Sequence, residues 1–135
     1  MQYRTINVSA SRCYDIHIGR GLLAKLGEFI RPVLGGCRLA VLTDSNVDAL
    51  YGNAIMDNLT AAGYDACKYV IPAGEASKCA DNLLAFLNFL AQEQITRSDA
   101  VIAFGGGVVG DLGGLSASLY LRGIKYIQVP TTLLA

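Results

Sequence analysis

The chain lacks clusters of histidine and cysteine. His17 is its single histidine, and its four cysteines include no C-x-x-C pair. Metal sites built on Cys and His need several such ligands at short spacings, which this sequence does not offer. One histidine, remote in sequence from the other polar motifs, also argues against a Ser-His or Cys-His catalytic pair. We therefore expect no metal ligands and no catalytic residues within the chain, and a structural role for His17.

An excess of charge of one sign is also missing. Eleven Lys and Arg residues balance eleven Asp and Glu residues, and the two signs are mixed along the chain. Proteins that bind nucleic acids or anionic membranes usually carry a basic stripe. We therefore expect neither nucleic acid nor a membrane surface as a partner.

No segment has the pattern of a membrane span or a secretory signal. The first residues contain no apolar block, which a secretory signal requires. The most apolar stretch, residues 100–121, contains six glycines and has Asp111 at its centre. A central Asp costs about 2.5 to 3.5 kcal/mol on insertion, so we expect no spanning helix. These absences and the unpaired spacing of the cysteines predict a protein of the reducing cytoplasm.

The composition favours one globular domain over residues 1–135. Hydrophobic residues make up 53% of the 135 residues and charged residues 16%. A chain of this length can build a hydrophobic core without disulfide or metal support.

Strand and helix patterns alternate along the chain. Two alternating segments, Tyr3–Ser9 and Tyr14–Ile18, predict an antiparallel hairpin, and Leu22–Ile30 has helical spacing. Short apolar runs predict strands buried on both faces at Leu39–Leu42, Tyr69–Ile71, Val101–Phe104 and Tyr126–Val129. Helical periods lie between them at Val47–Ala62, Lys78–Gln94 and Val108–Leu121. The order predicts an α/β fold: an open, mainly parallel sheet with helices on both faces and an N-terminal antiparallel hairpin.

The last residues, Pro130–Ala135, contain a threonine cap followed by good helix formers but stop before one full turn. We therefore expect the chain to be a fragment.

A glycine-rich turn is the most informative motif. Residues 105–111, Gly-Gly-Gly-Val-Val-Gly-Asp, follow a predicted strand, open a helix and satisfy the spacing G-x-G-x-x-G. Glycines let a ligand approach the backbone, and the free amides of a helix N-terminus favour a diphosphate. The alternative is a tight turn whose glycines only allow the helix to pack on the strand.

An acidic residue for a ribose is expected about twenty positions after such glycines, and none is present. Asp44 ends an earlier strand and could face the same crevice. The alternative here is structural, because Ser45 and Asp48 have the spacing of a capping box.

Two shorter motifs lie at predicted helix ends. Glu75 and Lys78 place a carboxylate and an ammonium three residues apart in a loop, where they could hold a polar cofactor or begin a helix. Arg122-Gly123 has the form of a helix stop.

Together these motifs resemble the 3-dehydroquinate synthase family. The resemblance rests on Gly74-Glu75-x-x-Lys78, the glycine turn through Leu112, Tyr120-Leu121-Arg122-Gly123 and the run from Gln128 to Leu134, in this order. It covers the chain from about Arg38 onward. It implies a Rossmann-like NAD-binding domain. A later helical domain, absent here, would bring a glutamate and two histidines as ligands for zinc or cobalt.

The resemblance also implies roles for individual residues. Arg122 would reach the substrate. The remaining implied residues would form the NAD site: Asp44, Asn46, Glu75, Lys78, Gly106, Gly107, Val108, Asp111, Thr131, Thr132 and Leu134. Members of the family convert 3-deoxy-D-arabino-heptulosonate 7-phosphate to 3-dehydroquinate and phosphate in the shikimate pathway, a carbon-oxygen lyase reaction, and a homodimer is expected for the whole enzyme.

Three alternatives stay open at this point. The chain could belong to another sugar-phosphate cyclase, of the deoxy-inosose or valiolone synthase type, since such enzymes share the cofactor site. A metal-dependent polyol dehydrogenase also carries a glycine triplet after a strand, although Gly110-Asp111 and Arg122-Gly123 argue against it. A non-catalytic nucleotide-binding module would equally lack metal ligands. We expect the chain alone to bind NAD weakly, to be inactive and to self-associate through its uncovered surface.

Overall fold

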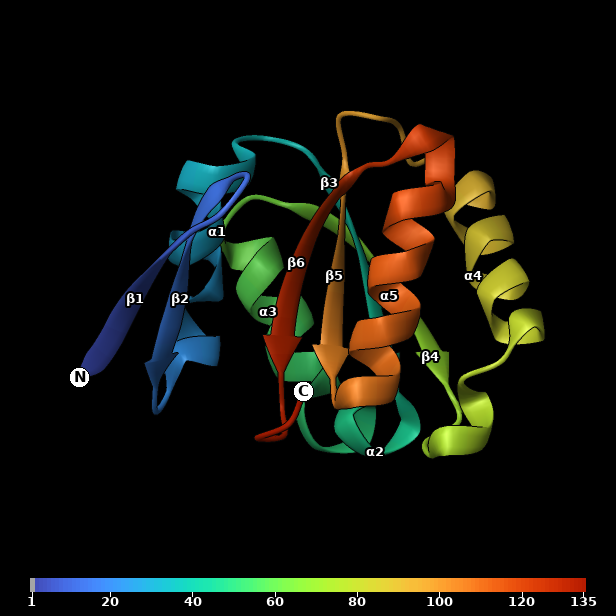
Figure 1. The fold of residues 1–135 in the computed structure, drawn as a ribbon, viewed down its shortest axis with the longest axis horizontal. Coiled ribbons are helices and arrows are strands. Elements are labelled where there is room, and N and C mark those ends of the chain that lie inside the picture. Colours follow the sequence, from blue (N-terminus) through green and yellow to red (C-terminus); the bar gives the residue numbers. More distant parts are fainter. Residues whose placement is uncertain (1) are drawn as a thin grey trace.

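A parallel sheet with helices on both faces forms the main body of the molecule (Figure 1). The structure is a computed structural model and describes residues 2–135. The strands are β1 (Tyr3–Ser9), β2 (Cys13–Gly19), β3 (Arg38–Asp44), β4 (Asp65–Ile71), β5 (Ala100–Gly105) and β6 (Lys125–Pro130). The α-helices are α1 (Leu26–Leu34), α2 (Ser45–Val47), α3 (Asn53–Ala61), α4 (Ala80–Gln92) and α5 (Gly107–Leu119). Short helical segments are η1 (Leu22–Lys25), η2 (Asp48–Gly52), η3 (Glu75–Ser77) and η4 (Tyr120–Arg122).

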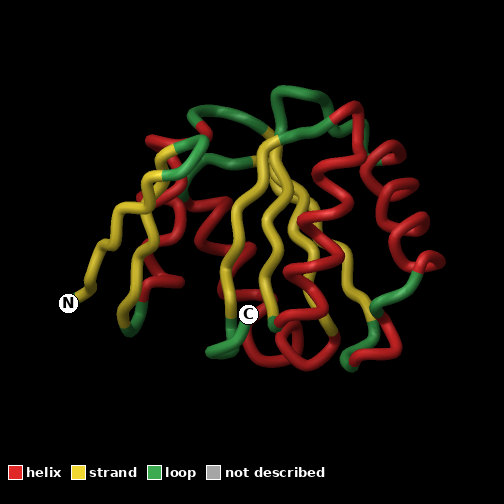
Figure 2. The backbone as a smooth tube through the Cα atoms, viewed as in Figure 1, coloured by secondary structure: helices red, strands yellow, loops and turns green. Residues whose placement is uncertain are grey.

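The sheet has the order β4-β3-β5-β6, and all of its strand pairs are parallel. Figure 2 shows these strands as one twisted layer, with the β1–β2 hairpin standing apart. Helices α1 and α3 pack on one face, and α4 and α5 pack on the other. The predicted fold class is therefore confirmed.

The central strands β3 and β5 have continuously apolar sequences because both of their faces are buried. In β3, Leu39 and Val41 enter the core beneath α1 and α3, whereas Ala40 and Leu42 enter the core beneath α4 and α5. These four side chains are fully buried, since both faces of the strand are covered.

The edge strands differ from the prediction. Tyr69–Ile71 and Tyr126–Val129 were expected to be buried on both faces, but Val70 is 39% exposed and Gln128 is exposed. Strands β4 and β6 each have a neighbour on one side only. Tyr69 and Ile71 of β4 and Ile127 and Val129 of β6 pack in or against the core under the helices, while Val70 and Gln128 reach solvent.

Two predicted helices also differ in detail. The segment Val47–Ala62 is interrupted by η2, a π-helical turn between α2 and α3. A Cβ at Gly52 would lie 2.0 Å from the Asp48 carboxylate, so any other residue there would displace the carboxylate that pairs with Lys68. The predicted helix Leu22–Ile30 begins as the 3₁₀ turn η1 and continues as α1 to Leu34.

The N-terminal hairpin is confirmed as an antiparallel pair. On one face, Tyr3 and His17 pack against Phe29 of α1, and Thr5 bonds to the His17 ring. On the other face, Ile16 and Ile18 are 41% and 53% exposed. Within residues 2–135, no helix is long and apolar enough to cross a membrane.

Candidate cofactor site at the carboxyl ends of the strands

The carboxyl ends of all four parallel strands meet at one edge of the sheet, where their arrowheads point in Figure 1. After β3 the chain continues to β4, which pairs on one side of β3. After β5 it continues to β6, which pairs on the opposite side of the sheet. The sheet order therefore reverses between β3 and β5. Open parallel sheets bind ligands in the crevice at such a switch point. Asp44 ends β3 and Gly105 ends β5, so both lie beside it.

Two glycines of the glycine-rich segment, Gly105 and Gly113, are required by packing. An added Cβ would lie 2.8 Å from the Val109 side chain at Gly105, and 2.8 Å from the Ala103 side chain at Gly113. At Gly110 it would lie 2.9 Å from the amide at the end of the exposed Gln128 side chain, which can move aside. For Gly105 and Gly113 the structural alternative holds, because these glycines let α5 lie close to the sheet.

Gly106 and Gly107 have no such explanation within the fold. A Cβ on Gly106 would come no closer than 3.4 Å to Thr132, and one on Gly107 would meet nothing within 4 Å. Neither residue has a positive φ angle. The two glycines thus leave an open cradle at the surface, bordered by the half-buried Val108.

The N-terminus of α5 leaves its amide groups free. Gly106 occupies the N-cap position without a side-chain hydrogen bond, and the first turn contains no acidic residue. Such a helix end carries a partial positive charge and unpaired N–H donors, which suit a phosphate or diphosphate. The cradle and the free amides fit the diphosphate of a dinucleotide.

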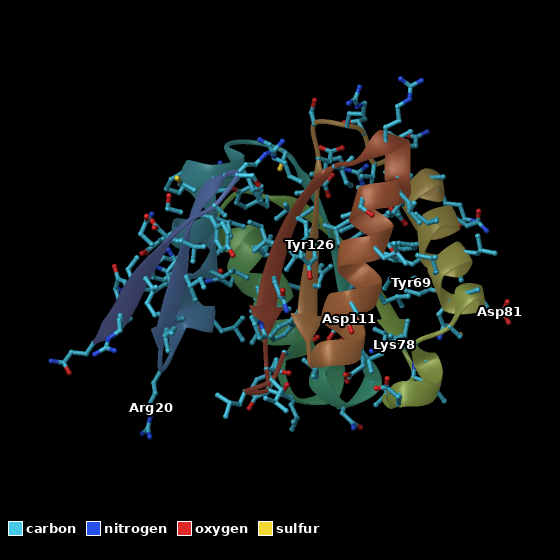
Figure 3. The ribbon with its side chains drawn as sticks, in the orientation of Figure 1. Arg20, Tyr69, Lys78, Asp81, Asp111 and Tyr126 are labelled. Carbon is cyan, nitrogen blue, oxygen red and sulfur yellow. The ribbon has the colours of Figure 1, made fainter. Side chains whose placement is uncertain are left out.

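Lys78 lies beside this cradle and is held by two carboxylates. Its ammonium nitrogen is 2.9 Å from Asp111 on α5 and 3.3 Å from Glu75 in η3. Figure 3 shows Lys78 and Asp111 side by side near the start of α5. Bonding to Asp111, and then to Glu75, raises the pKa of the Lys78 ammonium above its usual value. The structure therefore brings together three predicted site residues, two from the segment around η3 and one from α5, and Lys78 stays charged.

At the end of β3, the capping box predicted for Ser45 and Asp48 is wrong. Asp44 itself caps α2, since its carboxylate accepts a hydrogen bond from Val47 N at 2.9 Å. The Ser45 hydroxyl accepts from Ala73 N at 3.0 Å, and Asp48 pairs with Lys68 at 2.6 Å.

The prediction missed the connecting role of Ser45. Its bond ties the β3 turn to the loop that carries Glu75 and Lys78. Ser45 and Ala73 lie far apart in the sequence, and no local sequence pattern predicts a contact between them. Asn46 is exposed next to Asp44, on the same turn.

The residues after β6 return toward the glycine turn. Thr131 N donates to the carbonyl of Gly105 at 2.9 Å, and Thr132 borders Gly106. Leu134, also predicted for the site, is 97% exposed. The threonines are thus beside the cradle, while the side chain of Leu134 faces solvent.

Arg122 is not brought to this edge. It lies in η4, at the far end of α5 from Gly107, and α5 has 13 residues. At about 1.5 Å per residue, the separation along the helix is roughly 20 Å. The predicted helix runs to Leu121, but α5 ends at Leu119, and Arg122 and Gly123 follow it in and after η4. Leu121, Arg122 and Gly123 all have positive φ angles.

The described residues do not fit a metal ion. Among residues 2–135, no group of three or more His, Cys, Asp or Glu side chains is placed to hold one. The four cysteines are free thiols.

Comparison with known proteins identifies related sequences. The family model described as 3-dehydroquinate synthase N-terminal matches residues 68–135. The 3-dehydroquinate synthase of Enterococcus faecalis is 48% identical over 122 residues, which are 90% of this chain and 34% of that protein. The chain thus spans about a third of the length of the curated relatives it matches.

Solved structures with a similar fold include two cyclases. A 2-epi-5-epi-valiolone synthase from Streptomyces hygroscopicus subsp. jinggangensis, with NAD+ and Zn2+ bound, has a TM-score of 0.78 and 31% identity over 95% of this chain and 35% of that one. A 2-deoxy-scyllo-inosose synthase, complexed with carbaglucose-6-phosphate, NAD+ and Co2+, has a TM-score of 0.85 and 22% identity over 95% of this chain and 35% of that one. At that identity the second likeness shows the fold alone.

Proposed function

Because this chain belongs to the 3-dehydroquinate synthase N-terminal family, we propose that it is the NAD-binding part of a 3-dehydroquinate synthase. The observation that carries the proposal is the cradle at Gly106 and Gly107, where glycine is not needed by the fold. A backbone that must admit a ligand explains two glycines that neither packing nor backbone conformation requires.

The described residues divide the binding task among three turns. The amides that begin α5 would hold the diphosphate, with Thr131 and Thr132 beside it. Asp44 and Asn46, at the end of β3, would hold the adenosine ribose. Lys78, oriented by Asp111 and Glu75, would supply a positive charge beside the start of α5. The exposed Leu134 would have to turn toward the cofactor to contact it.

In this proposal the whole enzyme converts 3-deoxy-D-arabino-heptulosonate 7-phosphate to 3-dehydroquinate and phosphate, as a carbon-oxygen lyase. NAD, when bound, supplies a reversible hydride acceptor, so the overall conversion is redox-neutral. The metal ligands would lie in the remainder of the enzyme, and the chain alone would be inactive. We also assign the protein to the cytoplasm, which its free thiols support, and expect the whole enzyme to be a homodimer.

Arg122 keeps its proposed contact with the substrate. Because it lies at the far end of α5, this contact would form apart from the cofactor cradle of the same chain. In the full-length enzyme, Arg122→Lys should raise KM for the sugar phosphate and leave NAD affinity unchanged.

Calorimetric titration with NAD tests the cofactor site. Gly107→Ala should weaken NAD binding at least about tenfold while leaving the thermal midpoint unchanged, since its Cβ meets no protein atom within 4 Å. Gly36→Ala is the matched control, because Gly36 is equally open and has no positive φ. Equal NAD affinity in wild type and Gly107→Ala would contradict the proposal.

A related sugar-phosphate cyclase is the second candidate, favoured by the fold match to the inosose and valiolone synthases. Phosphate release by the full-length protein from 3-deoxy-D-arabino-heptulosonate 7-phosphate separates the two. NAD binding without this release would favour the second candidate.

A further inference from the structure

Tyr126 of β6 connects the strand to α5 by a directional bond. Its hydroxyl donates to the carbonyl oxygen of Gly110 at 2.9 Å. Its ring lies along Gly113 and Gly114, where added Cβ atoms would lie 3.6 and 3.5 Å from ring carbons. Burial, and then the nearby Asp111, raise the pKa of the Tyr126 hydroxyl, so it remains a donor at neutral pH. Figure 3 shows Tyr126 on β6 and Asp111 on the adjoining helix.

The hydroxyl bond of Tyr126 matters for the position of α5 because the face of α5 toward β6 is formed by glycines. Buried side chains of α5, including Val109 and Leu112, pack against the sheet. On the side of the helix that faces β6, Gly110, Gly113 and Gly114 have no side chains, so there the Tyr126 ring and hydroxyl make the contact. The Tyr126 hydroxyl fixes the first turns of α5 along the strand axis. The bond from Thr131 N to the Gly105 carbonyl fixes the preceding turn at the end of the same strand.

The placement of α5 decides whether its free amides are useful. Preorganised donors stabilise a ligand only when they are aimed at its charged atoms, and errors of about 1 Å are costly. The amides of Gly107 and Val108 have no capping side chain to orient them. Their position relative to Thr131 and Thr132 therefore depends on how α5 is held against β6.

We infer that Tyr126 is a positioning residue of the proposed NAD site, which holds the start of α5 through Gly110 so that its free amides face the diphosphate. The inference rests on the proposed function. It adds a residue that touches no cofactor atom and acts only through the helix.

The chain contains a matched control for this inference. Tyr120, at the other end of α5, donates its hydroxyl to the carbonyl of Ile95 at 2.6 Å. Tyr126→Phe and Tyr120→Phe each remove one hydroxyl and keep the ring. Both should lower the thermal midpoint by a few degrees. Only Tyr126→Phe should weaken NAD binding, by about fivefold in calorimetric titration.

Each outcome of the titration decides the matter. NAD binding by Tyr126→Phe at wild-type affinity would overturn the inference. Equal weakening of NAD binding by both variants would also overturn it, because it would mean that each hydroxyl affects binding only through the overall stability of the fold. Failure of the wild type to bind NAD would overturn the proposed function and this inference with it. If Tyr126→Phe does not fold, Tyr126→Phe with Gly114→Ala replaces it, because alanine at 114 is at ordinary contact distance and favours the helix.

Discussion

At the scale of single residues, Asp44 has one observed role and one proposed role, which substitution can separate. Its carboxylate caps α2 by accepting a hydrogen bond from Val47 N, and in the proposed function it also holds the adenosine ribose. Asp44→Ala should cost about 1 kcal/mol of unfolding free energy through the lost cap. Asp44→Asn keeps an acceptor oxygen and should cost much less. Both should weaken NAD binding, Asn by about three- to tenfold, since the charge-assisted hydrogen bond is lost.

Urea unfolding and calorimetry on the two Asp44 variants provide the test. Undiminished NAD affinity in Asp44→Asn would remove the ribose role and leave Asp44 as a cap alone.

Cys67 provides a prediction on pH. Burial raises the pKa of its thiol from 9.0 to about 11. The folded state therefore keeps a proton that the unfolded state loses, so the free energy of unfolding should fall as the pH rises from 9.0 to about 11. Cys67→Ala should show a smaller fall over this window.

Chemical denaturation of both proteins across that pH range measures the difference. Thiol reagents at about pH 8 should also modify the exposed Cys13 and Cys79 before Cys67. Identical pH profiles for wild type and Cys67→Ala would contradict the assignment.

At the scale of elements, α5 should respond oppositely to alanine at two adjacent glycines. A Cβ at Gly113 would lie 2.8 Å from Ala103, inside the sheet contact, whereas at Gly114 it would be 3.5 Å from the Tyr126 ring. Gly113→Ala should destabilise the fold by about 1–3 kcal/mol through overpacking. Gly114→Ala should be neutral or stabilising by up to about 1 kcal/mol, because alanine favours helix. Equal losses in urea unfolding would show that the helix does not rest on the sheet at Gly113.

The elements also show what the sequence could predict. Continuous apolar runs located β3 and β5, and the glycine motif located the turn at the end of β5, because both signals are local. Whether a strand lies at the centre or the edge depends on the order of strands, so the exposure of β4 and β6 was missed. The cap on α2 was assigned to Ser45 because Ser45 and Asp48 have capping-box spacing, whereas the residue that caps α2 is Asp44, one position earlier. The tie from Ser45 to Ala73 joins segments far apart in sequence and has no local signature.

The family resemblance reached further than the local patterns. It grouped Glu75, Lys78 and Asp111 before the structure placed them in ion-pair contact, and the family itself is confirmed. The cofactor and substrate roles of all these residues remain predictions. The side chains of Arg122 and Leu134 do not join the cradle.

At the scale of the whole molecule, the uncovered hairpin face predicts self-association. Ile6 and Ile16 are cross-strand partners and are 42% and 41% exposed, with Ile18 beside them at 53%. Exposed apolar patches of this kind promote contacts between molecules. Light scattering should show a mass that rises with protein concentration, and Ile16→Lys should reduce the rise. Leu84→Lys, at an exposed leucine of α4, is the control. A wild-type monomer at high concentration would refute this prediction.

The central claim is that the backbone amides at the start of α5 bind the diphosphate of NAD. Titration of the ¹⁵N-labelled chain with NAD, followed by nuclear magnetic resonance, observes these amides directly. The account predicts that the signals of Gly106, Gly107 and Val108 shift most and saturate together, while those of the β1–β2 hairpin stay in place. Saturable binding that leaves these three amides unmoved would contradict it.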